Sequence, residues 1–304
     1  MNDPIVCLRQ VHKAYGRSRV LNGLDMYVPE GSVYGLLGRN GAGKTTTLRM
    51  LMDLVRPGSG SLEVMGHAPA GLPMVLRQQI GYSSDSMQLI PWLSVAELLN
   101  YNGSFYPDWD PEYVKTWLQR LELQAGKRVF SLSRGDRQKL ALIMAIGHRP
   151  RLLILDEPAG GLDPLARKEF LESIIELIHE SGTTIVLSSH QMSDLERIAD
   201  TIGLMVDGRM RLERSLEELK LRSRRVQILG ASGAQAGIEG IVHQHLRGGL
   251  LELVLENWSA ETEQKLLRHF PEARIESSPL SLEELFLVYT SKLAAGGAPC
   301  PAAL

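Results

Sequence analysis

The chain has 304 residues, and its 33 lysines and arginines against 35 aspartates and glutamates give a formal net charge of −2. Hydrophobic residues make up 44% and charged residues 22%, which is typical of a globular protein with a buried core and about two domains. The nearly neutral charge argues against a dedicated nucleic-acid binder, so no nucleic-acid partner is expected.

The two cysteines lie at opposite ends of the chain, which excludes a disulfide framework. No stretch approaches the roughly 18 apolar residues of a membrane span, and the N-terminus lacks the regions of a signal peptide. We therefore expect a soluble, cytoplasmic chain.

The first 60 residues predict strands, a loop and a helix. Ile5–Val11 and Val20–Val28 have β-branched or alternating patterns, with Tyr15-Gly16 as turn material between them. Val33–Leu37 is a short apolar run typical of a buried strand. A helix follows the next loop and is predicted to end at Pro57-Gly58; its apolar face carries Leu48, Leu51, Met52 and Val55.

The middle of the chain is first helical and then alternating. From about residue 86 to 148 we predict three helices, Val95–Phe105, Pro111–Leu123 and Asp136–Gly147, with Asp110 as the N-cap of the second. Strands are then predicted at Leu152–Leu155, Thr183–Leu187 and Thr201–Val206, and helices between them at Leu165–Glu180 and Met192–Ala199. This alternation predicts an α/β fold with a parallel sheet covered on both faces.

A change in composition after Glu213 indicates a second, smaller α+β domain over residues 215–293. Its predicted elements are the strands Leu250–Leu255 and Ala273–Glu276 and the helices Glu261–Phe270 and Leu282–Leu293. Residues 294–304 are low in complexity and are predicted to be a disordered tail.

A glycine-rich segment separates the strand Val33–Leu37 from the helix after it. It matches the pattern G-x-x-x-x-G-K-[ST] over Gly38-Arg39-Asn40-Gly41-Ala42-Gly43-Lys44-Thr45. Glycines let the backbone point its N–H groups at phosphate oxygens, and the helix N-terminus adds a positive dipole. We predict that Lys44 reaches the β- and γ-phosphates of ATP and that Thr45 ligates Mg²⁺, and we include Thr46 among the nucleotide-binding residues.

Two adjacent acids follow the strand Leu152–Leu155. Ligands of parallel α/β sheets bind at the carboxyl ends of the strands, so Asp156 is predicted to ligate Mg²⁺ directly or through water. Glu157 is predicted to orient or deprotonate the water that attacks the γ-phosphate.

Further motifs lie in order along the same chain. Leu132-Ser133-Arg134-Gly135-Asp136-Arg137-Gln138 is similar to the LSGGQ signature of ATP-binding-cassette (ABC) proteins, and Gly161-Leu162-Asp163-Pro164 is similar to their D-loop. Ser188-Ser189-His190 is similar to their switch-histidine motif, and Tyr15 stands where the family stacks an aromatic ring on adenine. The chain thus resembles the nucleotide-binding subunit of an ABC transporter over roughly residues 5–213. The resemblance implies ATP contacts for Tyr15, Ser133, Gly135 and Asp163 and a catalytic role for His190.

The chain departs from the family pattern at two of these motifs. Arg134 and Asp136 replace the third and fifth signature residues, so Ser133 and Gly135 matter most. In the Q-loop, Asp85 stands where the family has glutamine or, in some exporters, glutamate. We predict that Asp85 touches Mg²⁺ through water; alternatively, the alignment slips and Gln88 takes the role.

The resemblance also implies an architecture and partners. The fold would be a P-loop NTPase of the ABC-ATPase type over residues 1–214: a mixed sheet with helices on both faces, a helical subdomain at about 86–148 and an antiparallel β subdomain. Two such subunits would bind ATP head to tail, and the presence of both Glu157 and His190 favours a homodimer or the active half of a heterodimer. The chain would lie at the inner face of the cell membrane through a separate integral-membrane permease, and the transport would be export.

A surface and some rival functions remain open. Pro91, Trp92, Leu93 and Tyr101 either receive the permease or pack inside the helical subdomain. One rival is a soluble ABC ATPase that acts on ribosomes or DNA. Another is a P-loop kinase, which would not explain Leu132–Gln138. The C-terminal domain would regulate, dimerise or stabilise the subunit, and the transported substrate is not specified by this sequence.

Overall fold

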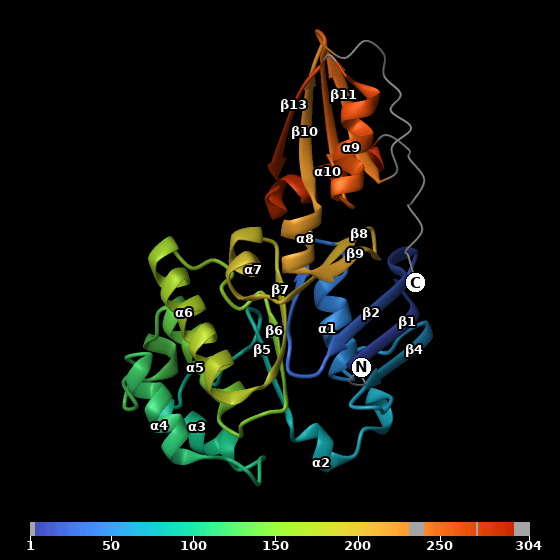
Figure 1. Cartoon of the computed structure of the whole chain (residues 1–304). Helices are drawn as coiled ribbons and strands as arrows, with labels where there is room; N and C mark the ends of the chain where they lie inside the picture. The colour runs from blue at the N-terminus through green and yellow to red at the C-terminus, as the bar shows by residue number, and fades with distance from the viewer. Residues whose placement is uncertain (1–3, 231–239, 272, 295–304) are drawn as a thin grey trace. The chain divides into compact units, whose positions relative to one another are not determined.

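The computed structural model describes residues 4–230, 240–271 and 273–294, which belong to two compact units, Met1–Glu213 and Arg214–Leu304 (Figure 1). None of the helices within those residues is long and apolar enough to cross a membrane. The predicted tail, 294–304, lies outside the described residues except for Ala294, which ends a helix.

A six-stranded sheet forms the centre of the first unit. Its strand order is β5 (Ile80–Ser84), β6 (Leu152–Asp156), β7 (Thr184–Ser189), β3 (Val33–Leu37), β8 (Thr201–Val206) and β9 (Arg209–Ser215). The first five strands are parallel, and β3, β6 and β7 are buried along their whole length. This burial is expected of a parallel sheet with helices on both faces, and it confirms the predicted α/β class.

Four helices pack around this sheet. Helix α1 (Lys44–Leu51) contacts β6, α5 (Arg134–Ile146) contacts β5, and α7 (Met192–Ile198) contacts β3, β7 and α6 (Pro164–Ser181). The prediction that α1 continues to Pro57 is wrong, because Asp53 has the left-handed φ of 58° and the helix ends at Leu51. Val55 still packs against the core that the helix covers.

A second sheet is antiparallel, with the order β2 (Ser18–Pro29), β1 (Pro4–Tyr15) and β4 (Ser59–Val64). It shares one hydrophobic core with the central sheet, to which Leu24 of β2, Leu36 of β3 and Leu48 of α1 all belong. Strand β4 was not among the predicted elements. Because the core is shared, the loop that joins β3 to α1 lies between the two sheets.

The helical subdomain contains α3 (Val95–Gly103), α4 (Pro111–Arg120) and the start of α5, and the short helix α2 (Met74–Arg77) precedes β5. Figure 1 shows α3, α4 and α5 together on one side of the central sheet, with β1, β2 and β4 on the other. Asp110 caps α4 as predicted, since its carboxylate accepts from Tyr113 N at 2.9 Å. Helix α5 begins two residues earlier than predicted because Ser133 caps it, with its hydroxyl 3.0 Å from Asp136 N.

The second unit is an antiparallel sheet with helices. The strand order is β11 (Ile241–Arg247), β12 (Leu250–Leu255), β10 (Arg224–Leu229) and β13 (Arg274–Pro279), and the helices are α8 (Leu216–Arg222), α9 (Ala260–His269) and α10 (Leu282–Ala294). Its core joins β10 and β12 to Leu266 and Phe270 at α9. Arg225 of β10 bonds Glu252 at 3.0 Å and Glu284 of α10 at 2.8 Å. The strands β10 and β11 and the helix α8 were not predicted.

Candidate nucleotide site

The loop between β3 and α1 adopts a conformation that depends on glycine. Gly41 and Gly43 have φ angles of 85° and 106°, and a Cβ on Gly43 would lie 2.6 Å from Leu21 Cδ2 of the antiparallel sheet. Residues 39–41 are exposed, whereas residues 42–44 are buried. The exposed part of the loop thus lies directly before the N-terminus of α1, and the predicted binding of phosphate there stays a prediction.

Lys44 lies at the first residue of α1, and its side chain is only 5% exposed. Its ammonium donates to the carbonyl of Gly38 at 2.6 Å, at the start of the same loop. It also forms an ion pair with Glu157 Oε1 at 3.1 Å. The lysine is thus fixed within the loop that it is predicted to complete.

The carboxyl ends of β6 and β7 bring the second group of polar residues to the same place. Thr45 Oγ1 donates to Asp156 Oδ1 at 3.1 Å, and Ser188 Oγ of β7 donates to the same oxygen at 2.7 Å. Asp156 and Ser188 are direct partners in the parallel register, so the pairing of β6 with β7 produces this contact. The sequence motif includes Ser188, but the hydrogen bond from Ser188 to Asp156 was not predicted.

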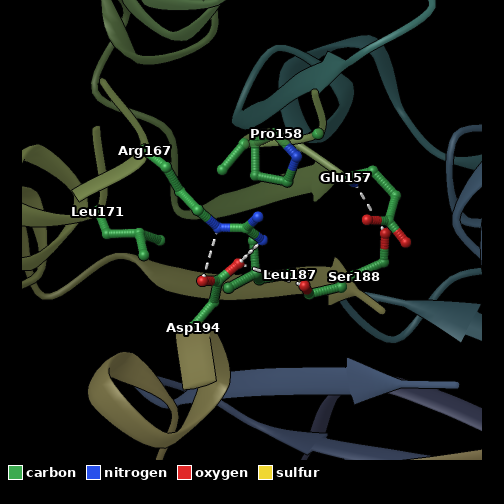
Figure 2. A pocket seen from close by; sticks show the side chains of 10 residues that line it. Glu157, Pro158, Arg167, Leu171, Leu187, Ser188 and Asp194 are labelled. Atoms are coloured by element: carbon green, nitrogen blue, oxygen red, sulfur yellow. Dashed lines mark hydrogen bonds and ion pairs between the residues drawn. The ribbon is translucent and has the colours of Figure 1, made fainter. Parts of the chain in front are cut away.

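Glu157 directly follows β6 in the left-handed conformation, with a φ of 50°. Such values are rare for residues other than glycine and cluster at functional sites. The backbone N–H of Glu157 donates to Ser188 Oγ at 2.9 Å, and its Oε2 lies 2.7 Å from His190 Nδ1 (Figure 2 shows Glu157 and Ser188). Lys44, Glu157 and His190 therefore form a chain of charged and polar groups beside the phosphate loop.

The remaining predicted site residues lie on other segments. Ser133 and Gly135 are at the N-terminus of α5, Asp163 caps α6 by accepting from the N–H groups of Leu165 and Ala166, and Tyr15 ends β1. The Tyr15 ring is 49% exposed and has Lys13 Nζ 5.2 Å from its centroid. Its predicted stacking on adenine stays a prediction.

Asp85 follows β5 directly, and its carboxylate is already bonded. Arg134 Nη2 lies 2.8 Å from Oδ1 and 2.9 Å from Oδ2, and Gln138 Nε2 donates to Oδ1 at 3.2 Å. Gln88 lies three residues further along the chain and is exposed. The contact between Asp85 and the signature segment was not predicted. Asp85 and Arg134 both depart from the family pattern, and their opposite charges were the signal that could have indicated an ion pair.

A small pocket lies behind Glu157, between α6 and α7. Figure 2 shows that two of the residues lining it, Arg167 of α6 and Asp194 of α7, are bonded directly to each other. Arg167 Nε donates to Asp194 Oδ1 at 2.8 Å, and its Nη2 bonds Oδ2. Asp194 Oδ2 also accepts from Ser189, the residue before His190, at 3.4 Å. The pair thus links the helix after the D-loop to the segment that carries His190.

A phosphate loop after β3, a carboxylate pair at the end of β6 and a histidine after β7 define a P-loop nucleotide hydrolase with a helical subdomain inserted before β6. The family model described as ABC transporter matches residues 21–160. The bacitracin transport ATP-binding protein BcrA of Enterococcus faecalis is 39% identical over 70% of this chain and 70% of its own length. The ABC transporter ATP-binding protein YtrB of Bacillus subtilis is 30% identical over 92% of this chain and 96% of its own length, so that match extends through most of the second unit.

A solved structure agrees with these matches. The protein cbiO1 from Clostridium perfringens, described as part of the ABC transporter complex cbiONQ, is 26% identical and superimposes with a TM-score of 0.62 over 72% of this chain and 91% of its own. The chain belongs to the ABC transporter family and is an ATP-binding ATPase subunit. The predicted fold and activity are thereby confirmed. Subunits of this family act with membrane permease components.

Proposed function

We propose that two copies of this chain bind ATP and Mg²⁺ head to tail, hydrolyse the ATP and so drive export through a separate integral-membrane permease. The observation that carries the proposal is the linked group of Lys44, Glu157 and His190 at the carboxyl ends of β6 and β7. A carboxylate held between a cation and an imidazole beside a phosphate loop suits the hydrolysis of a bound phosphoanhydride.

We assign individual residues to the steps of that hydrolysis. The loop N–H groups, the N-terminus of α1 and Lys44 bind the phosphates of ATP. Glu157 orients a water molecule and takes its proton as the water oxygen bonds to the γ-phosphorus. The bond from phosphorus to the β–γ bridging oxygen breaks, and ADP leaves with that oxygen. His190, 2.7 Å from Glu157 Oε2, holds the carboxylate in place.

The donor set beside the loop fits a Mg²⁺ ion. Thr45 and Asp156 present a hydroxyl and a carboxylate oxygen 3.1 Å apart, and Mg²⁺ prefers oxygen ligands. These two residues would hold the ion, which supplies charge neutralisation for the phosphates when it is bound. Ser188, on the neighbouring strand β7, orients the Asp156 carboxylate, because its hydroxyl donates to Asp156 Oδ1 at 2.7 Å.

The second half of the ATP site would come from the signature segment of a second copy. A Cβ on Gly135 would meet nothing closer than Leu162 Cδ2 at 3.5 Å, and Ser133 is exposed, so the N-terminus of α5 is open to a ligand. Helix N-termini attract phosphate through their free N–H groups and their dipole. Loss of the γ-phosphate on hydrolysis would remove the charge that bridges the two copies.

Exposed aromatic side chains on the helical subdomain support a permease partner. Trp92 and Phe130 are 70% and 68% exposed, and they lie on adjacent segments because Phe130 N donates to the carbonyl of Pro91 at 3.0 Å. Tyr101, also exposed, contacts Phe105 edge to face. Large exposed apolar groups mark interaction sites, so we place the permease here and the chain at the inner face of the membrane.

A matched pair of substitutions tests the ATP-driven dimer. We expect Glu157→Gln to reduce turnover at least about hundredfold, because it removes the proton acceptor but keeps its shape, and to make the dimer persist with ATP. Lys44→Ala should abolish binding of a fluorescent ATP analogue and with it the ATP-dependent dimer. Turnover and sedimentation with and without ATP measure these effects. Unchanged turnover in Glu157→Gln, or a monomer at saturating ATP, would refute the proposal. Recovery of ribosomes or DNA with the chain would favour the rival function.

A further inference from the structure

Two of the three residues that depart from the ABC pattern in the Q-loop and the signature, Asp85 and Arg134, are bonded to each other. Arg134, the first residue of α5, places Nη2 within 2.9 Å of both carboxylate oxygens of Asp85. In the family pattern these positions are an uncharged glycine and a glutamine or glutamate, which cannot form an arginine–aspartate pair. The two substitutions thus complement each other in this chain.

Asp85 is fixed to the catalytic strand by its own backbone. Its N–H donates to the carbonyl of Asp156 at 3.1 Å, at the end of β6 and one residue before Glu157. Its carboxylate therefore has a defined position relative to the carboxylate pair, and whatever it bonds is positioned with it.

Arg134 and Gln138 reach this carboxylate from one face of α5, since they are four residues apart. Gln138 Nε2 donates to Asp85 Oδ1 at 3.2 Å and to the carbonyl of Gly160, in the segment before the D-loop, at 2.9 Å. A Cβ on Gly161 would lie 2.3 Å from Arg134 Cζ, and Gly161 has a φ of 68°. The guanidinium therefore lies against the backbone of the D-loop, where only glycine leaves room for it.

The exposure of the pair argues against a stabilising role. The side chains of Arg134 and Asp85 are 51% and 38% exposed, and ion pairs with that exposure contribute little to folding stability. What the pair does supply is geometry, because Arg134 Nη2 bonds both oxygens of the Asp85 carboxylate and so limits the position of the guanidinium.

We propose that Asp85 is a positioning residue in this chain: it holds Arg134 and thereby sets the place of Ser133 and Gly135, and of the D-loop, relative to the catalytic strand. The inference rests on the proposed head-to-tail dimer, in which Ser133 and Gly135 meet the ATP of the second copy. It gives Asp85 a role other than Mg²⁺ contact, and the two roles predict different behaviour for the Arg134 variants.

A double-mutant cycle in the Glu157→Gln background tests the inference with full-length protein. We expect Arg134→Ala and Asp85→Asn each to weaken ATP-driven dimerisation by about tenfold or more, because small displacements of binding groups have large effects. The double variant should be no weaker than either single one, since both remove the same contact. Binding of the fluorescent ATP analogue to the monomer and the thermal unfolding midpoint should stay unchanged.

Arg149→Ala is the matched control. Arg149 also forms an exposed pair in the same subdomain, with its Nε 3.0 Å from Asp110 Oδ2, and it lies away from the site loops. It should leave dimerisation unchanged. Additive losses, or no loss in either single variant, would overturn the inference. A higher Mg²⁺ requirement for nucleotide binding in Asp85→Asn alone would also overturn it and favour metal contact. If the Glu157→Gln parent itself failed to dimerise with ATP, the proposed function would fall first.

Discussion

Replacement of Arg167 by methionine would break the buried ion pair between α6 and α7 and leave Asp194 without its cation. The two side chains are 13% and 7% exposed, and two hydrogen bonds join them (Figure 2). After the substitution, the carboxylate of Asp194 would retain the contact with Ser189 Oγ at 3.4 Å, which is near the limit of a hydrogen bond.

The expected loss of stability is large because the surviving charge stays buried. Removing one partner of a buried pair costs about 3–5 kcal/mol, whereas an exposed pair is worth about 0–1 kcal/mol. Arg149→Ala provides the comparison, because the side chains of Arg149 and its partner Asp110 are 59% and 32% exposed. The double variant Arg167→Met/Asp194→Leu should recover most of the loss, since apolar groups of similar volume often replace a buried pair at little cost.

Urea unfolding followed by tryptophan fluorescence would measure these differences. Trp92, Trp109 and Trp117 belong to the first unit and Trp258 to the second, so a Trp258→Phe background confines the signal to the unit that holds the pair. With an m-value of about 3 kcal/mol/M, the midpoint of Arg167→Met should fall by about 1 M or more. A fall no larger than that of Arg149→Ala, or a double variant no more stable than Arg167→Met, would refute the reasoning.

Two further predictions concern the helical subdomain. Burial lowers the pKa of His148, which stacks on Tyr106 with centroids 3.9 Å apart, from 6.5 to about 4. The unfolded chain therefore binds a proton at His148 more tightly than the folded protein does. The free energy of unfolding should fall as the pH drops below about 6.5, by about 2 kcal/mol between pH 7.5 and pH 5. His148→Phe keeps a ring on Tyr106 and should lose that part of the pH dependence in urea titrations; an identical pH dependence in both proteins would contradict the assignment. Trp92→Ser should reduce recovery of the permease on co-purification from membranes without changing ATP turnover of the isolated subunit, and full recovery would place the docking surface elsewhere.

The phosphate loop, the buried strands and the helix caps could be predicted because each depends on residues close together in the sequence. Val33–Leu37 is a strand as predicted, and Asp110 caps α4. Gly41 and Gly43 have the positive φ angles that a phosphate loop requires. The family resemblance added Ser133, Gly135, Asp163 and His190, whose roles in the nucleotide site stay predictions.

Several strands could not be predicted, because their stability comes from partners far away in the chain. Strand β4 has exposed serines and a glycine, and it forms through its pairing with β1. Strand propensity depends strongly on such neighbours. Strand β9 did carry a local signal, since Asp207-Gly208 has positive φ at both residues, as in a two-residue hairpin turn.

The residue pattern alone indicates a phosphate loop, a carboxylate pair at the end of a buried strand and a nearly neutral net charge. Which side chains meet depends on how the strands and helices pack together. Asp156 accepts a hydrogen bond from Ser188 because β6 and β7 pair in parallel register. Asp85 accepts one from Arg134 of α5, which lies 49 residues further along the chain. Such contacts are set by the packing of whole elements against a shared core, and the residue pattern within any one segment does not contain that information.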